Sequence, residues 1–243
     1  DHSPREAWHT IPWRKLEVSV CKLQRRSSHA TIRGETQKAR RLQTLLATSW
    51  SAKSLATRRV TQDNKGNKTA GVDGVHTLTP PQRLPLIPAL DLDTPVQPVR
   101  RVWRPKPGTA AERPRGIPVM HDGAAQALVT LAFAAAWEAP FAPHRVGCRP
   151  GHACQEAFGA IFESLKRPPR CVLDADIARC FDTREHAALL DKINTSPPFV
   201  RPLQAWRRAG VGASGMFMPT GAGTPQGGGI SPAGAGRHAV ENH

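Results

Sequence analysis

Apolar residues recur at helical spacing in two stretches near the start of the chain. The first series is Trp13, Leu16, Val20 and Leu23, and the second is Ala39, Leu42, Leu46 and Trp50. Positions three and four apart share one face of a helix, so both series predict amphipathic helices within residues 8–60. The opposite faces are basic, which leaves two interpretations open: solvated surfaces, or surfaces that lie against a phosphate backbone.

Farther along the chain, the patterning predicts strands as well as helices. Residues 61–74 are expected to form a polar loop, and residues 80–98 a proline-rich connector with one short helix. Residues 99–103 and 116–120 are expected to pair as a β-hairpin with a long basic tip. Further helices are predicted at 123–138, at the apolar series Phe158, Ile161, Phe162 and Leu165, after Thr183, and at 200–208.

The charge balance points to a polyanionic partner. The 243 residues hold 34 Lys and Arg against 19 Asp and Glu, a net charge of +15. Such an excess favours nucleic acid, with an anionic membrane surface as the competing interpretation. No apolar run is long enough for a membrane span, and the five cysteines form no CxxC pair. We therefore expect no membrane partner and a reducing, cytoplasmic setting.

Acidic residues stand out in residues 171–182, which open with a short apolar run typical of a buried strand. Side chains alternate along a strand, so Asp174 and Asp176 share one face. Two carboxylates on a core strand are costly unless they are solvated, paired or bound to a cation. Two interpretations follow: a strand end with solvated acids, or a divalent-metal ligand for phosphoryl transfer.

The tip of the predicted hairpin carries Lys106, Arg113 and Arg115. Arginine offers a bidentate fork to phosphate, so this tip suits a phosphate clamp, although an ordinary solvated hairpin has the same pattern. The glycine-rich segment 221–232 lacks the GxxxxGK spacing of a P-loop, which argues against mononucleotide binding of that kind.

Taken together, these segments resemble the reverse transcriptase domain of group II intron-encoded proteins. The segments that carry the resemblance occur in the family's order: the leader within residues 8–60, NKGNKTAGVDG at 64–74, RRVWRPKP at 100–107, ERPRGIPV at 112–119, RPG at 149–151, VLDADIARCFD at 172–182 and GTPQGG at 223–228. The resemblance implies an α+β fold of the right-hand polymerase type. Residues 1–74 are then a helical, RNA-binding leader, residues 75–232 the fingers and an incomplete palm, and residues 233–243 an aberrant tail.

The resemblance also implies the chemistry of the family, which is RNA-templated addition of deoxynucleotides to a DNA primer with two Mg²⁺ ions. Each position that matches a family motif then takes a role. Asp176 and the carbonyl of Ile177 are metal ligands, Lys106 and Arg113 hold the triphosphate, Phe181 lies under the sugar, and Gln226 and Gly227 shape the wall beside the templating pair. Basic residues of the leader and its loop contact intron RNA: Lys22, Arg25, Arg26, Lys65 and Lys68.

The sequence departs from the family in its acidic residues. The family carries a second motif with two adjacent aspartates, whereas this sequence has no Asp-Asp pair and no Asp after Asp191. One carboxylate is a poor site for two hydrated Mg²⁺ ions, so we expect that this chain alone does not polymerise. The segment after Pro232 lacks the family's apolar helix, which we interpret as a frameshift or recombination.

Three hypotheses for the chain therefore remain open. It is a fragment of a group II intron reverse transcriptase, a non-catalytic fragment that retains only RNA contacts, or an unstable product whose open sheet edge favours aggregation. The sequence makes no prediction of the oligomeric state.

Overall fold

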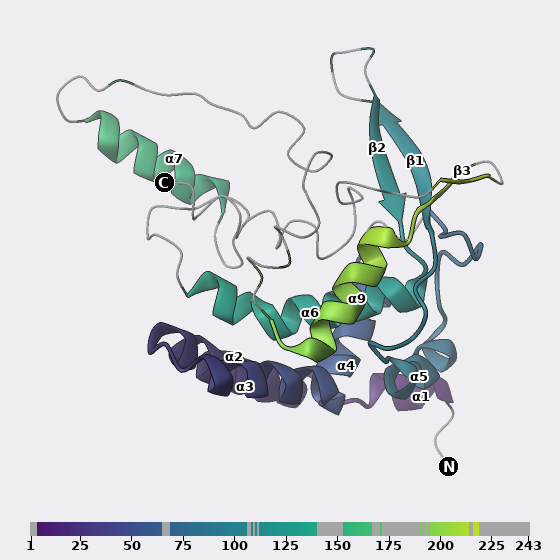
Figure 1. Cartoon of the computed structure of the whole chain (residues 1–243), viewed down its shortest axis with the longest axis horizontal. Helices are drawn as coiled ribbons and strands as arrows, with labels where there is room; N and C mark the ends of the chain where they lie inside the picture. Colours follow the sequence, from purple (N-terminus) through teal and green to yellow (C-terminus); the bar gives the residue numbers. More distant parts are fainter. Residues whose placement is uncertain are drawn as a thin grey trace.

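Helix α6 (Met120–Glu138) lies at the centre of the fold, between helices of the N-terminal region and helix α9 (Figure 1). The computed structural model describes residues 4–64, 69–105, 108, 110, 112–139, 153–166, 171, 190, 193, 195–213 and 216–218. Helix α6 is apolar on nearly all sides, and most of its residues from Asp122 to Trp137 are buried. A helix without a polar face must be covered all round, and the neighbouring helices do this.

Within the described residues 4–63, four helices and one π-helical turn make up the N-terminal region. They are α1 (Pro4–His9), α2 (Trp13–Ile32), α3 (Thr36–Thr48), α4 (Trp50–Arg58) and η1 (Arg59–Asp63). Gly34 has a φ of 72°, a left-handed conformation that suits glycine, and it turns the chain between α2 and α3. Both predicted helices are confirmed, and their inner faces join α6 in one core that includes Val20 and Leu46.

One residue of the second apolar series lies outside its predicted face. Trp50 is not on α3, because Ser49 adopts an extended conformation, ends α3 and begins α4. The Ser49 hydroxyl accepts a hydrogen bond from the Ala52 N–H at 3.2 Å, which is the usual role of an N-cap serine. Trp50 is consequently 50% exposed, and its predicted place on the apolar face of the second helix is wrong.

A small sheet follows the connector helix α5 (Pro80–Ala89). Among the described residues it has the order β2-β1-β3-β4, with β1 (Val99–Pro105), β2 (Glu112–Ile117), β3 (Val211–Ala213) and β4 (Met216–Met218). The predicted hairpin is confirmed as the antiparallel pair β1 and β2, although β2 begins earlier than expected. The sheet joins distant parts of the chain, because Val99 and Val211 are partners in a parallel ladder. Helices with a small mixed sheet place the fold in the α+β class.

The last two described helices bury very different fractions of their apolar side chains. Helix α9 (Pro197–Arg208) packs Phe199, Leu203 and Trp206 into the main core. Helix α7 (Cys154–Leu165) forms as predicted, yet its apolar residues remain exposed, with Phe158 71% and Phe162 61% accessible.

Aromatic contacts define the middle of the core. The rings of Phe133 and Trp137 are stacked with centroids 4.8 Å apart, and Phe199 of α9 meets Phe133 edge-on at the same distance. Phe133 is 1% exposed. Offset and edge-on aromatic pairs stabilise a core beyond the area they bury. Phe133 is therefore a central contact between helices α6 and α9.

A buried ion pair fixes the start of α6 to the connector. Asp122 is 3% exposed, and its Oδ2 accepts a hydrogen bond from the Gln97 N–H at 2.9 Å. Its Oδ1 lies 3.6 Å from Nδ1 of His121, whose Nε2 lies 3.3 Å from the Ala89 carbonyl oxygen. Both ring nitrogens face acceptors, and only the protonated imidazole has two donors. The hydrogen bond to Asp122 raises the pKa of His121, against an opposing effect of burial.

We predict that Phe133→Ala lowers the free energy of unfolding by about 3–5 kcal/mol, because it leaves a cavity among α6, α9 and the N-terminal helices. Urea unfolding measures this loss. Phe162→Ala on α7 is the matched control, and its effect is expected to stay within about 0.5 kcal/mol because that ring is exposed. Equal losses in the two variants would contradict the central place of Phe133.

Stability is also predicted to fall as the pH rises through the raised pKa of His121. A folded-state pKa above the ordinary value means that the stabilisation is complete below about pH 6.5 and is lost above the folded pKa. Melting temperatures from pH 5.5 to 8.5 measure this fall. His121→Gln should flatten the profile, whereas His76→Gln, at an exposed position, should leave it unchanged. A profile unaffected by His121→Gln would refute this assignment.

Candidate nucleic-acid interface

Basic side chains form a stripe along the outer face of α2. Lys15, Lys22, Arg26, His29 and Arg33 are all exposed, and their spacings of seven, four, three and four residues place them on one side of the helix. The side facing the core holds the buried residues of α2. The helix thus presents a row of cationic or titratable groups to solvent, a pattern suited to a phosphate backbone.

Within the described residues, little neutralises this stripe. Glu17 is the single acidic residue in α2, and its Oε1 lies 3.6 Å from Nη1 of Arg58 on α4. In the part of the chain that the structure describes, Lys22, Arg25 and Arg26 have no ion pair and are exposed. The structure therefore places these three predicted contact residues together on the surface.

The β-hairpin presents a second basic surface. Its register pairs Arg100 with Ile117, Val102 with Arg115, and Arg104 with Arg113. Directly opposed residues share a face of an antiparallel pair, so Arg100, Arg104 and Arg115 belong to one face, and all three are exposed. On the other face, the guanidinium of Arg101 lies over the exposed ring of Trp103, 5.8 Å from its centroid.

A groove of about 460 Å³ opens where the hairpin meets the N-terminal region. Its walls come from η1, the following loop, β2 and the first turns of α6. Arg59 and Arg115 line it, and both are exposed. Asp63 also lines it, but its carboxylate lies 3.4 Å from Nε of Arg58, so its charge is partly neutralised. The groove is therefore predominantly cationic.

The GVDG turn at residues 71–74 holds one side of this groove in place. A Cβ on Gly71 would lie 3.0 Å from Cα of Val119 and 3.1 Å from the Pro118 carbonyl oxygen, so any other residue would force the neighbouring backbone to shift. Asp73 accepts a hydrogen bond from the Val75 N–H at 3.1 Å, and Gly74 has a φ of 74°. These features form a tight turn against the junction of β2 and α6.

Most of the predicted catalytic and nucleotide-binding residues lie outside the described residues. These are Lys106, Asp176, Ile177, Phe181, Gln226 and Gly227. Two residues predicted to contact RNA, Lys65 and Lys68, also lie outside the described residues. Arg113 lies in β2 opposite Arg104, and the structure describes its backbone position alone. Within the described ranges, no group of three His, Cys, Asp or Glu side chains could hold a metal ion. Nor is any described helix long and apolar enough to cross a membrane.

Several residues of the interface were not predicted from the sequence. Arg100 and Arg104 alternate with Val102, so the period of a strand already indicated a common face. Lys15 and Arg33 extend the α2 stripe at helical spacing and could have been found in the same way. Arg59 had no such signal, because its place in the same groove as Arg115 comes from the packing of η1 against α6.

Comparisons with known proteins support a specific family. Residues 8–90 match the N-terminal domain of reverse transcriptase. The chain is 30% identical over 187 residues to protein YkfC of Escherichia coli, an alignment that covers 72% of this chain and 49% of that protein. It is 32% identical over 139 residues to the group II intron-encoded protein LtrA of Lactococcus lactis, covering 56% of this chain and 23% of LtrA.

The chain thus spans about half of one relative and about a quarter of the other. The matched domain covers every helix from α2 to α5, including the basic stripe. On these grounds the chain belongs to the group II intron-encoded reverse transcriptases and maturases, of which it carries an N-terminal region.

Proposed function

We propose that this chain is part of an RNA-directed DNA polymerase of a group II intron, and that its N-terminal helices bind the intron RNA. The observation that carries the proposal is the α2 stripe, an exposed basic surface with a single acidic residue on its helix. It lies inside the segment that matches the N-terminal domain of reverse transcriptase. Like charges three or four residues apart on a helix repel one another and destabilise it. A bound polyanion would remove this repulsion, which favours a binding role for the stripe over a structural one.

The hairpin and the groove extend this surface. The hairpin face has three exposed guanidinium groups, each planar and able to donate two hydrogen bonds to one phosphate: Arg100, Arg104 and Arg115. The exposed ring of Trp103 provides a surface on which a base can stack. We propose that the RNA template passes between the hairpin face and the groove lined by Arg59. Lys65 and Lys68, which stand in the sequence between the groove residues Asn64 and Thr69, would add contacts to the same strand.

For the polymerase chemistry, the proposal relies on the resemblance of the motifs. Asp176 and the carbonyl of Ile177 would hold Mg²⁺, while Lys106 and Arg113 would hold the triphosphate of the incoming deoxynucleotide. Phe181 would lie under its sugar, and Gln226 and Gly227 would border the templating pair. When bound, Mg²⁺ would neutralise charge on the phosphates and activate the primer hydroxyl. We propose that the segments carrying these residues are arranged as the fingers and palm of a right-hand polymerase.

The alternative is a non-catalytic RNA-binding chain. It is favoured by the absence of any Asp-Asp pair in the 243 residues, because two Mg²⁺ ions require several oxygen ligands in fixed positions. We propose that these residues alone bind RNA without extending a primer. The setting that we propose is reducing and cytoplasmic, in keeping with the free, exposed Cys21, Cys154 and Cys171.

The first prediction of this function concerns salt. Log affinity for intron RNA should fall steeply and linearly with log salt. The triple variant Lys22→Gln, Arg25→Gln, Arg26→Gln should make that slope shallower by about 2, because each phosphate that the protein neutralises adds about 0.7–0.9 to it. Filter binding between about 50 and 300 mM salt measures both slopes.

A control variant removes lysines whose charge already has a partner. Lys38 Nζ lies 2.6 Å from Glu35, and Lys166 Nζ lies 2.8 Å from Glu163. The double variant Lys38→Gln, Lys166→Gln should therefore leave the slope nearly unchanged. If it weakens binding as much as the triple variant does, the stripe is not where RNA binds.

The second prediction concerns catalysis. Primer extension on an RNA template with Mg²⁺ and deoxynucleotides should yield no product from the purified chain beyond the background of an Asp176→Asn variant. Retained RNA binding in the same preparation shows that the protein is folded. Extension that disappears in Asp176→Asn would reject the non-catalytic proposal and support an active polymerase.

A further inference from the structure

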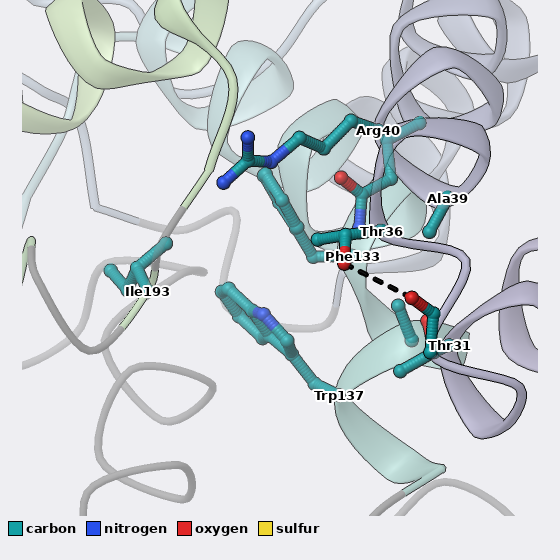
Figure 2. Close-up of a pocket in the computed structure, with 10 residues that line it drawn as sticks. Thr31, Thr36, Ala39, Arg40, Phe133, Trp137 and Ile193 are labelled. Atoms are coloured by element: carbon teal, nitrogen blue, oxygen red, sulfur yellow. Dashed lines mark hydrogen bonds between the residues drawn. The ribbon is translucent and has the colours of Figure 1, made fainter.

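The cationic groove and a smaller cavity lie along opposite halves of helix α6. The cavity has a volume of about 110 Å³, and its lining residues include Thr31, Thr36, Phe133 and Trp137 (Figure 2). Phe133 and Trp137 are 1% and 4% exposed, so these rings present no open face to a ligand. The groove, with a volume of about 460 Å³ and exposed arginines in its walls, is the more accessible of the two.

One wall of the groove is built by the π-helical turn η1. Arg59, Val60 and Asp63 of this turn line the groove, together with Asn64, which follows it. Single π-helical turns are rare and are frequently found at functional sites. The position of η1 determines where the Arg59 guanidinium lies, so the contacts that hold this turn bear on what the groove can bind.

The side chain of Gln62 ties η1 to two other helices. Its Oε1 accepts a hydrogen bond from Nε1 of Trp8 at 2.9 Å and another from Nη1 of Arg83, also at 2.9 Å. Trp8 belongs to α1 and Arg83 to α5, and the Arg83 guanidinium lies over the Trp8 ring, 5.3 Å from its centroid. A single oxygen atom thus joins η1, α1 and α5.

The two donors to this oxygen are themselves held in place. Trp8 is 1% exposed and belongs to an apolar cluster that includes Leu16. Nε of Arg83 donates a hydrogen bond to the Leu78 carbonyl oxygen at 3.0 Å. A buried indole N–H requires an acceptor, and Gln62 supplies it. The Gln62 side chain therefore meets donors whose positions are fixed by other parts of the fold.

The ion pair at the end of η1 does not replace these contacts. Nε of Arg58 lies 3.4 Å from Oδ2 of Asp63, and the Asp63 side chain is 48% exposed. Exposed ion pairs contribute little to stability, and this one joins η1 only to the adjacent end of α4. The partners of Gln62 are 54 and 21 residues away in the sequence, so its hydrogen bonds fix η1 relative to α1 and α5.

We propose that Gln62 is a positioning residue for RNA binding, which holds η1 so that Arg59 meets the RNA in the groove. The inference rests on the proposed function, because RNA is the ligand that we propose for this groove. Without the Gln62 acceptor, the buried indole N–H of Trp8 loses its partner, and that cost favours a shift of the turn. A shifted turn takes Arg59 away from the distance at which it donates a charge-assisted hydrogen bond to a phosphate.

The experiment measures how much Arg59→Gln weakens binding of intron RNA in three backgrounds of the full chain. These are the wild type, Gln62→Met, which keeps a side chain of similar length without the acceptor, and Gln62→Glu, which keeps an acceptor oxygen. Arg59→Gln is expected to weaken binding about tenfold in the wild type and in Gln62→Glu, the effect of one hydrogen bond to a charged group, but less than about threefold in Gln62→Met. Each loss is measured within one background, so the charge that Gln62→Glu adds is present on both sides of the comparison.

Arg26→Gln on the α2 stripe is the matched control, because Arg26 is exposed and lies outside the groove lining. Its effect on RNA affinity should be the same in all three backgrounds. Melting curves verify that every variant is folded at the assay temperature, which separates positioning from stability. Should Gln62→Met fail to fold, Arg83→Met replaces it with the same expected result, since it removes one donor to the same oxygen from a half-buried position.

The outcomes separate this inference from the proposed function. If wild-type protein binds RNA and Arg59→Gln weakens binding equally in the wild type and in Gln62→Met, the positioning role is overturned and RNA binding stands. An effect of Arg59→Gln that shrinks as much in Gln62→Glu as in Gln62→Met, or an effect of Arg26→Gln that shrinks with it, also overturns the role. Absence of RNA binding by the folded wild-type chain overturns the proposed function, and this inference with it.

Discussion

Burial of α6 governs the arrangement of the other elements. A helix that is apolar on every side has no stable position at a surface, so the chain must cover it from several directions. The N-terminal helices cover one side and α9 covers another, with Phe133 in contact with both Trp137 and Phe199. These helices use their apolar faces inward, which leaves their basic faces for solvent and for a ligand.

The basic surfaces follow from this arrangement. Helix α2 packs through Leu16 and Val20, and the register of the helix then fixes the lysine and arginine side chains on the far side. In the hairpin, the pairing of β1 with β2 aligns Arg100, Arg104 and Arg115. The GVDG turn closes against the junction of β2 and α6 because Gly71 lacks a side chain. One fold thereby brings a stripe, a hairpin face and a groove, all cationic, onto its surface.

The sequence predicted the parts of the structure that depend on neighbouring residues, and it failed where residues distant in the chain come into contact. Local periodicity predicted α2, α3, α6 and the hairpin, since each is encoded by neighbouring residues. The same periodicity placed Trp50 on the apolar face of the second helix, because spacing alone does not reveal that Ser49 ends one helix and caps the next. The strand β3 was missed, as its parallel pairing joins Val99 to Val211, which is distant in the sequence. The site was divided in the same way. Lys22, Arg25 and Arg26 were predicted and lie exposed together, whereas Arg59 acquires its surroundings through tertiary packing alone. Asp176 and its neighbours carry the resemblance to the polymerase motifs and lie outside the described residues.

RNA binding at the outer face of α2 can be checked by chemical footprinting of the lysines. Acetylation of lysine amines is mapped by mass spectrometry with and without intron RNA. We predict strong protection of Lys15 and Lys22 by RNA, with Lys166, next to the end of α7, equally reactive in both states. Unchanged reactivity of Lys15 and Lys22 at an RNA concentration that saturates binding would contradict RNA binding at this face.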